Sequence, residues 1–211
     1  MTKTNLSDAD RKINITDYTL REYALYLSSF QDKVLVIKTN SRTLNVVFSA
    51  DNMPHLIGFQ YAFDKRQNIK NYRGRKGMNL MLSGDVSFKN IEENIKKNRV
   101  RINKKLISWD EDIKPRIEWL PYFLNTVKKK SRLKIVDKTK VPHNLLQGNY
   151  YYFKNDRNDY LILSLLEFSK TSTPETFIVN NGIRFLANSE EEEITSVHWE
   201  MRAKKRKHSV G

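Results

Sequence analysis

The sequence is organised around the stretch Asp51-Asn-Met-Pro-His-Leu-Ile-Gly-Phe-Gln-Tyr-Ala-Phe63. Its beginning is a strong helix-start signal, because Asp51 or Asn52 can cap the first turn and Pro54 needs no hydrogen-bond partner there. Apolar residues at spacings of three and four then predict a helix that continues to Phe63 with one face buried. His55, one of four histidines in the chain, falls in the first turn.

The position of His55 supports two interpretations. The positive end of a helix dipole disfavours a second positive charge by about 0.3 to 1 kcal/mol, so the imidazole is expected to stay neutral near pH 7. A neutral imidazole can act as a general base. The side chain can also simply cap or pack, and the residues alone leave both interpretations open.

Size and composition favour one domain with a strong positive charge. The 211 residues are 39% hydrophobic, which is enough for one core, and no linker-like stretch divides them. We expect a loose polar arm at 1–15, one domain at 16–202 and a solvated basic tail at 203–211. The chain has 38 Lys and Arg against 24 Asp and Glu, and its formal net charge of +14 favours nucleic acid as a partner.

Several classes are disfavoured by what the sequence lacks. The absence of cysteine excludes disulfides, thiolate catalysis and cysteine-ligated zinc, and fits a reducing compartment. No apolar run reaches the roughly 18 to 20 residues of a membrane span, and the N-terminal segment lacks a signal peptide's apolar region. We therefore expect a cytoplasmic protein that does not bind membranes. No clustered histidines or suitably spaced acidic residues predict a metal ion, and no cofactor is expected.

The periodicity predicts helices first and strands later. Helices are expected at 16–30, 51–63, 85–107 (in one or two pieces) and 111–129, and a β-hairpin is expected at 34–48. Strand patterns separated by turn signals follow at 132–136, 149–154, 160–168, 175–180 and 194–202. The acidic run at 190–193 is expected to be an exposed turn. Because the connections are short, the fold class is α+β, with N-terminal helices and the hairpin packed on a C-terminal antiparallel sheet.

Two regions offer groups that suit nucleic acid. Six cationic side chains lie between residues 65 and 76, and Arg73, Arg75 and Lys76 are placed beside a glycine in a predicted loop that could wrap a phosphate chain. A mobile solvated loop would have the same composition. Tyr150 and Tyr152 could stack on bases.

Strand alternation supplies further candidates. In the strand at 194–202, His198 and Glu200 lie on the face opposite Trp199, where His198 could meet a substrate or be a plain surface residue. The same alternation places Thr176 on the face opposite Phe177.

Four short motifs stand out in the sequence: Asn52-Met-Pro-His-Leu-Ile-Gly58, Leu146-Gln-Gly-Asn-Tyr-Tyr-Tyr-Phe153, Asp159-Tyr-Leu-Ile162 and Pro174-Glu-Thr-Phe177. Through these motifs the chain resembles the phage-type barnase, EndoU, colicin and RelE-like nuclease families over about residues 16–202, in particular their fourth group. The resemblance implies a ribonuclease fold that often serves as a toxin of phages or mobile elements. It places His55 at the family's His-Leu-x-Gly position and Thr176 at the hydroxyl position of its Pro-x-Ser-Phe motif, with threonine replacing serine. His198 matches no family position.

The leading hypothesis is a metal-independent endoribonuclease. The 2′-OH of RNA would attack the phosphate, with His55 as base, His198 as acid and Thr176 orienting the phosphate. Phosphate would be held by Arg73, Arg75 or Lys76. One alternative is a noncatalytic RNA- or DNA-binding protein. Another is a protein-interaction module whose basic face meets an acidic cognate inhibitor, and this partner would also be compatible with a toxin.

Overall fold

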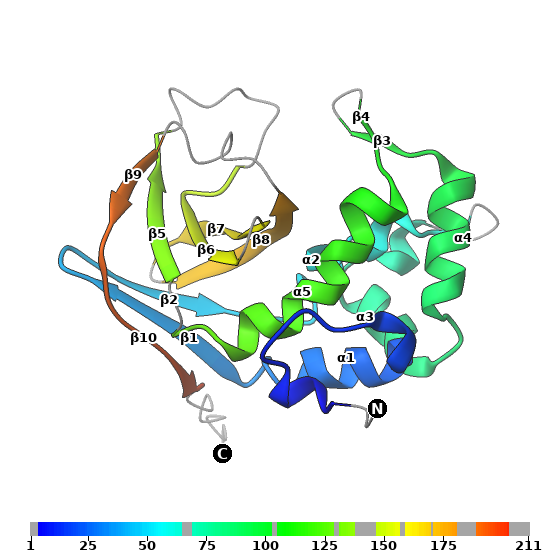
Figure 1. Cartoon of the computed structure of the whole chain (residues 1–211), viewed down its shortest axis with the longest axis horizontal. Coiled ribbons are helices and arrows are strands. Elements are labelled where there is room, and N and C mark those ends of the chain that lie inside the picture. Colours follow the sequence, from blue (N-terminus) through cyan, green and yellow to red (C-terminus); the bar gives the residue numbers. More distant parts are fainter. Residues whose placement is uncertain are drawn as a thin grey trace, which may run out of the picture.

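The computed structural model describes residues 4–64, 69–102, 105–128, 131–137, 147–156, 159–169, 171–180 and 189–202. A strongly curled sheet forms one side of the molecule, and helices pack beside it (Figure 1). This arrangement confirms the α+β class. The predicted tail at 203–211 and residues 65–68 of the basic loop lie outside the described residues.

The helices are short and most come before the C-terminal strands. They are η1 (Leu6–Asp8), η2 (Ile15–Asp17), α1 (Leu20–Ser28), α2 (Met53–Leu56), η3 (Phe59–Tyr61), η4 (Ile69–Tyr72), α3 (Gly74–Ser83), α4 (Phe88–Asn98), the π-helical turn η5 (Trp109–Ile113) and α5 (Lys114–Asn125). No helix in the described part of the chain is long and apolar enough to cross a membrane.

The strands form one large sheet and one small hairpin. The large sheet has the order β10-β1-β2-β8-β7-β6-β5-β9, and β3 pairs only with β4. Their bounds are β1 (Lys33–Thr39), β2 (Thr43–Val47), β3 (Arg101–Ile102), β4 (Lys105–Leu106), β5 (Ser131–Val136), β6 (Tyr150–Asp156), β7 (Asp159–Phe168), β8 (Thr171–Asn180), β9 (Ser189–Glu192) and β10 (Ile194–Met201). Pairing is antiparallel except between β2 and β8, which meet only at Val46 and Ser172. Beyond that pair, α2 packs against β8.

One bent segment joins the two edges of the large sheet. β9 pairs with β5, and β10 pairs with β1, with only Glu193 between them. The acidic run was predicted as an exposed turn, but residues 189–192 form strand β9 instead. Glu192 is held there by Thr39 Oγ1 at 2.8 Å, Ser41 Oγ at 2.8 Å and Arg42 Nη2 at 2.9 Å. Arg42 Nη1 also donates to Tyr150 Oη at 3.1 Å. We call these five residues the closure cluster.

The C-terminal end of α5 is anchored on the inner face of the sheet. Lys154 is 1% exposed, and its Nζ donates to Phe123 O at 3.2 Å and to Thr126 Oγ1 at 2.9 Å. Trp199 Nε1 donates to Leu124 O at 3.1 Å. A cation suits the carbonyl groups at a helix C-terminus, so these bonds fix α5 on the sheet.

Residues 4–15, whose composition predicts a loose arm, pack against α5. Leu6 and Ile13 are buried, and Ile13 N donates to Glu118 O at 3.0 Å. Lys12 Nζ lies 2.9 Å from Glu118 Oε2. Asn125 Nδ2 donates to Leu6 O at 2.7 Å. This part of the chain is therefore held in place.

The helix predicted at 85–107 ends earlier. It begins with a capping box between Ser87 and Asn90, and it ends at Arg99, whose φ of 48° is left-handed. A left-handed residue ends the helical hydrogen bonding, so the following residues form β3 and β4. The near-heptad apolar spacing that predicted a longer helix was therefore misleading beyond residue 98.

Candidate active site around His55

His55 is the residue of α2 that faces solvent. Its neighbours Met53, Pro54 and Leu56 are buried, whereas the His55 side chain is exposed. α2 packs against both α3 and β8. The three buried neighbours therefore hold a short helix that presents one imidazole beside β8.

The helix around His55 is shorter than predicted. It covers Met53–Leu56 rather than continuing to Phe63, and Asn52 makes no side-chain capping bond. Gly58 has a φ of 74°, and a Cβ there would lie 2.4 Å from Ile113 Cδ1. Glycine tolerates both the left-handed backbone and the close approach, so the chain turns here.

A β-bulge brings two consecutive side chains of β8 toward the same side. Ser164 of β7 pairs with Thr176, but the next residue, Leu165, pairs with Pro174. Glu175 is thus the extra residue of the bulge. Its Oε2 accepts a hydrogen bond from Ser164 Oγ at 2.6 Å, on the face where Thr176 also lies.

Arg116 enters the site from the first turn of α5. Its Nη1 donates to Thr176 Oγ1 at 3.4 Å, the single hydrogen bond of this guanidinium in the described part of the chain. Burial lowers the pKa of Arg116, and the nearby Tyr61 and Asp112 only partly oppose that effect. Asp112 does not pair with it, because its carboxylate accepts from Lys105 Nζ at 2.7 Å. Arg116 is half-buried, and a guanidinium whose other N–H groups have no acceptor in the described residues can bind an anion.

The imidazole is affected by groups from three other elements. Partial burial is the largest cause of the lowered pKa of His55, even though one side of the ring reaches solvent. Arg116 lowers it further, Glu175 opposes the change, and Arg73 adds a smaller lowering. The sequence predicted that the His55 imidazole stays neutral, and the lowered pKa agrees with that prediction. The causes are burial and nearby arginines rather than the dipole of a four-residue helix.

The three predicted phosphate contacts lie at the start of α3. Arg73 is its N-cap, and Arg75 and Lys76 lie in its first turn, so they belong to a helix rather than a loop. All three side chains are exposed, and the backbone N–H of Arg75 donates to Asp51 Oδ1 at 3.1 Å. Since the N-terminal end of a helix is positive, these cations form a surface that favours phosphate next to His55.

His198 is not brought to this site. It lies on β10, and β1 and β2 separate that strand from β8. Its Nε2 is 2.8 Å from Glu200 Oε1, a pair on the solvent-facing side of the strand. The alternation predicted for this strand is observed, but the role of His198 as the acid partner of His55 has no geometric support.

The two predicted base-stacking tyrosines are buried. Tyr150 is 4% exposed and its hydroxyl donates to Glu167 Oε2 at 3.1 Å. Tyr152 is fully buried and bonds to Ser131 Oγ at 2.7 Å. Neither ring has a face exposed for stacking on RNA, so the prediction that these two tyrosines stack on bases is wrong. Tyr151 points to the other face of the sheet, where Glu175 helps to raise its pKa, after burial, to about 12.

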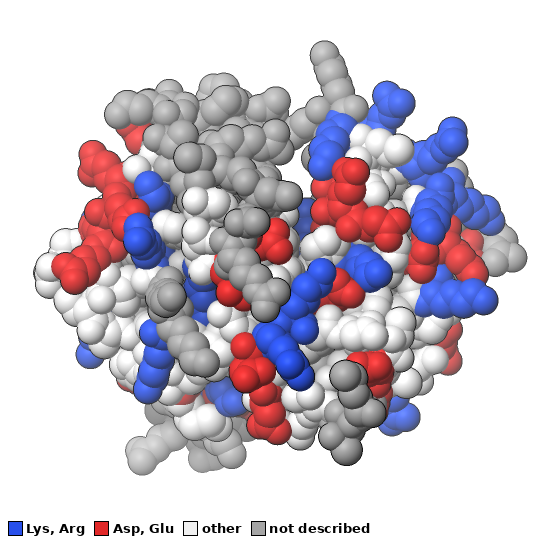
Figure 2. Space-filling model, in the orientation of Figure 1, with Lys and Arg blue, Asp and Glu red and all other residues white. Residues whose placement is uncertain are grey.

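Lys and Arg also gather over α4, β3 and β4, with acidic side chains among them (Figure 2). Several are paired: Lys89 with Glu93 at 3.9 Å, Lys96 with Glu92 at 2.5 Å, and Lys105 with Asp112 at 2.7 Å. This pairing neutralises part of the surface, which makes it a weaker candidate for binding phosphate than the start of α3.

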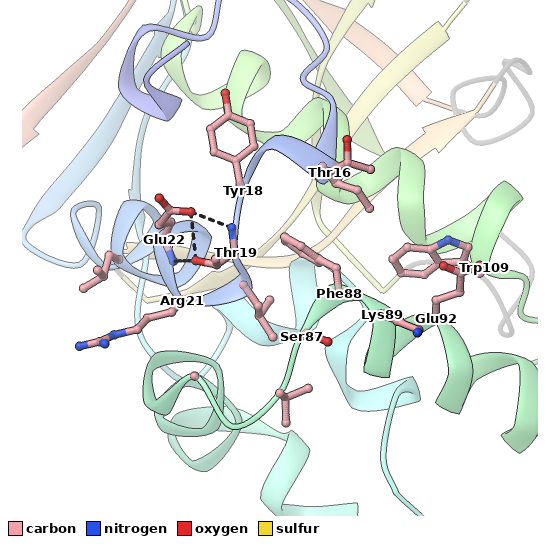
Figure 3. A pocket seen from close by; sticks show the side chains of 15 residues that line it. Thr16, Tyr18, Thr19, Arg21, Glu22, Ser87, Phe88, Lys89, Glu92 and Trp109 are labelled. Atoms are coloured by element: carbon pink, nitrogen blue, oxygen red, sulfur yellow. Dashed lines mark hydrogen bonds between the residues drawn. The ribbon is translucent and has the colours of Figure 1, made fainter. Parts of the chain in front are cut away.

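A separate apolar groove of about 840 Å³ lies between the start of α1 and the start of α4 (Figure 3). Phe88 and Trp109 line it, together with the hydrogen-bonded capping pair Thr19 and Glu22. None of the site residues around His55 borders it. In the described residues, no group of three or more His, Cys, Asp or Glu side chains could hold a metal ion.

An imidazole, a carboxylate and cations at one place are the groups with which a nuclease cleaves a phosphodiester. The chain belongs to the family described as phage-Barnase-EndoU-ColicinE5/D-RelE like nuclease 4, and the match spans residues 19–210. That span is nearly the whole chain and includes every residue of the site. Searches of curated proteins and of solved structures find no match.

Two site residues, Arg116 and Glu175, were not predicted from the sequence. Arg116 lies among the apolar residues of a helix, where a single cation gives no pattern. A signal existed for Glu175, because Pro174 cannot donate in a strand ladder and so indicates a bulge.

Proposed function

We propose that this nuclease is a metal-independent endoribonuclease with His55 as its general base. The observation that carries the proposal is the placement of a neutral imidazole beside Arg116, a half-buried guanidinium with a single hydrogen bond in the described residues. A phosphodiester would supply the missing acceptor oxygens. No protein carboxylate takes that position in the described residues.

The 2′-OH of RNA is the nucleophile in this mechanism. His55 removes its proton, the new bond joins O2′ to phosphorus, and the bond from phosphorus to O5′ breaks. The products are a 2′,3′-cyclic phosphate and a 5′-hydroxyl, and water protonates the leaving oxygen. Glu175, whose charge raises the pKa of His55, stabilises the imidazolium that forms.

The positive groups bind the phosphate as its charge develops. Arg116 donates from the buried side, and the hydroxyl of Thr176 lies within its hydrogen-bond reach. Arg73 and its neighbours at the start of α3 hold the adjoining strand. Such donors contribute most in a site from which water is partly excluded.

The test is cleavage of end-labelled single-stranded RNA in EDTA, with analysis of the new ends. Wild type should give the cyclic phosphate, and His55→Ala should reduce cleavage by roughly 10² to 10⁴. His198→Ala is the matched control and should cleave within about twofold of wild type, because its ring pairs with Glu200. RNA with a 2′-deoxy substitution at the cleaved position should be resistant. Equal cleavage of that substrate, or a need for added Mg²⁺, would overturn the proposal.

We also propose that the activity serves as a toxin in a phage or mobile-element setting, and the word phage in the family description supports the phage setting. Induced expression in bacteria should arrest growth for wild type and not for His55→Ala. An acidic inhibitor protein encoded nearby would fit the net charge of +14. Growth of cells that express active wild-type enzyme without any inhibitor would contradict the toxin role but not the ribonuclease.

A further inference from the structure

Both carboxylate oxygens of Glu175 are fixed by hydrogen bonds from its own surroundings. Oε2 accepts from Ser164 Oγ at 2.6 Å, and Oε1 accepts from the backbone N–H of Gln147 at 3.0 Å. Ser164 is fully buried on β7, directly across from Thr176. The only acceptor that the described residues offer its hydroxyl is therefore a carboxylate of the candidate active site.

Gly148 leaves the space that Ser164 needs. A Cβ at this position would lie 2.1 Å from Ser164 Oγ and 3.1 Å from the backbone N and O of Leu165. The next residue fixes the segment on β7, because Asn149 N donates to Leu165 O at 2.7 Å and Asn149 Oδ1 accepts from Glu167 N at 3.0 Å. The backbone thus runs so close to β7 that any side chain at 148 would displace the serine hydroxyl.

The bulge of β8 completes the arrangement. In a regular strand Glu175 and Thr176 would point to opposite faces. The extra residue in β8 lets the Glu175 carboxylate reach Ser164 on the face that Thr176 already occupies. A bulge next to an active site commonly re-aims one side chain, and the hydrogen bond from Ser164 defines where this one ends.

We propose that Gly148 and Ser164 form a cradle that positions Glu175 against His55, which makes Ser164 a positioning residue for the acid–base step. The inference rests on the proposed function, because the carboxylate serves catalysis only if His55 is the base. Without the serine hydroxyl, only the Gln147 N–H bond holds the carboxylate, so its position relative to His55 is less well fixed.

The first test does not depend on whether the protein cleaves RNA. Glu175 raises the pKa of His55, so a carboxylate released from Ser164 should raise it less. NMR titration of the histidine ring protons should therefore give a lower pKa for His55 in Ser164→Ala, in the same direction as in Glu175→Gln. Ser172→Ala, a second buried serine in the same sheet, is the matched control and should leave the titration unchanged.

The second test separates turnover from binding. Ser164→Ala should lower kcat about tenfold, the size of one hydrogen bond to a charged group, with KM within about twofold of wild type. Gly148→Ala should give a similar loss per folded molecule, because its Cβ displaces the serine hydroxyl. In the Ser164→Ala background the same glycine change should add little to the loss of kcat, since its target is already gone.

The outcomes separate the two proposals. The cradle is overturned if Ser164→Ala leaves kcat and the His55 titration unchanged while Glu175→Gln alters both. It is also overturned if the double variant loses kcat by the product of the losses in Gly148→Ala and Ser164→Ala. If wild type does not cleave RNA, the proposed function fails, and the NMR titration alone decides whether Ser164 holds the carboxylate.

Discussion

Two arginines of this protein show opposite ways of using the same side chain. Arg42 in the closure cluster is surrounded by acceptors, and hydrogen bonds to Tyr150 and Glu192 raise its pKa although burial alone would lower it. Arg116 has one long bond, to Thr176, and burial lowers its pKa. The first guanidinium stabilises the fold, whereas the second remains available for a ligand. Both side chains carry the same charge, so charge does not distinguish the two roles. The number of guanidinium N–H groups that already have an acceptor does.

The largest effect is expected when the guanidinium of Arg116 is removed. Arg116→Met should reduce RNA cleavage by about 10² to 10³, the usual loss for one transition-state donor. Its free energy of unfolding in urea should stay equal or rise, because a half-buried and poorly paired charge is removed. The control is Arg42→Met, which should cleave within about twofold of wild type per folded molecule. A severe loss of stability in Arg116→Met without loss of cleavage would assign Arg116 to the fold.

The reciprocal experiment measures stability at Arg42. Arg42→Met should lower the free energy of unfolding by about 1 to 2 kcal/mol, after allowance for the partial exposure of the cluster. Burial would raise the pKa of Glu192, but hydrogen bonds from Thr39, Ser41 and Arg42 outweigh it and lower that pKa below 4.5. The stabilisation is therefore complete above pH 4.5 and is lost as pH falls through the folded-state value. Urea unfolding at several pH values should show the two proteins converging in acid, and a constant difference would argue against this ion pair.

A third experiment compares how kcat/KM depends on pH in variants of Arg116 and Arg42. A neutral His55 is required as base, and its pKa lies below 6.5, so kcat/KM should fall on the acid side only below that ordinary value. Arg116 lowers the pKa of His55, so in Arg116→Met the acid limb should move to higher pH. Arg42→Met should leave the limb in place. Identical pH profiles for all three proteins would exclude Arg116 as a neighbour that controls the imidazole.

The smallest expected effect concerns exposed cations. Arg75→Ala, made in the His55→Ala background to prevent cleavage, should weaken binding of single-stranded RNA. It should also reduce the slope of log K against log salt by about 0.7, the value for one phosphate contact. Arg21→Ala on α1, another exposed arginine, should leave that slope unchanged. Equal slopes for both variants would show that the RNA strand does not contact the start of α3.

The sequence predicted the fold class, most strands and the start of the helix that carries His55, because these depend on local patterns. It placed Thr176 on the correct face, and the structure brings Thr176 and Arg73 to the neighbourhood of His55. Arg116 and Glu175 required knowledge of how α5 and β8 lie together. Alternation identifies which residues share a face, but it does not say which face is open.

The tyrosine run illustrates that limit. Tyr150 and Tyr152 share a face by alternation, and the prediction that they bind bases assumed that this face is exposed. It is the inner face, filled by α5 and the core, whereas Tyr151 lies with Ser164 and Glu175. The bulge at Glu175 adds a second uncertainty, because one extra residue reverses the alternation around it.

The joining of the sheet edges by β9 and β10 has a consequence for synthesis on the ribosome. β10 pairs with β1, and the bond from Thr195 Oγ1 to Lys38 O spans 157 positions of the chain. Until residues 189–201 have emerged, β1 has a free edge and the closure cluster lacks Glu192. The nascent chain therefore cannot complete its sheet while its last strands are still inside the exit tunnel.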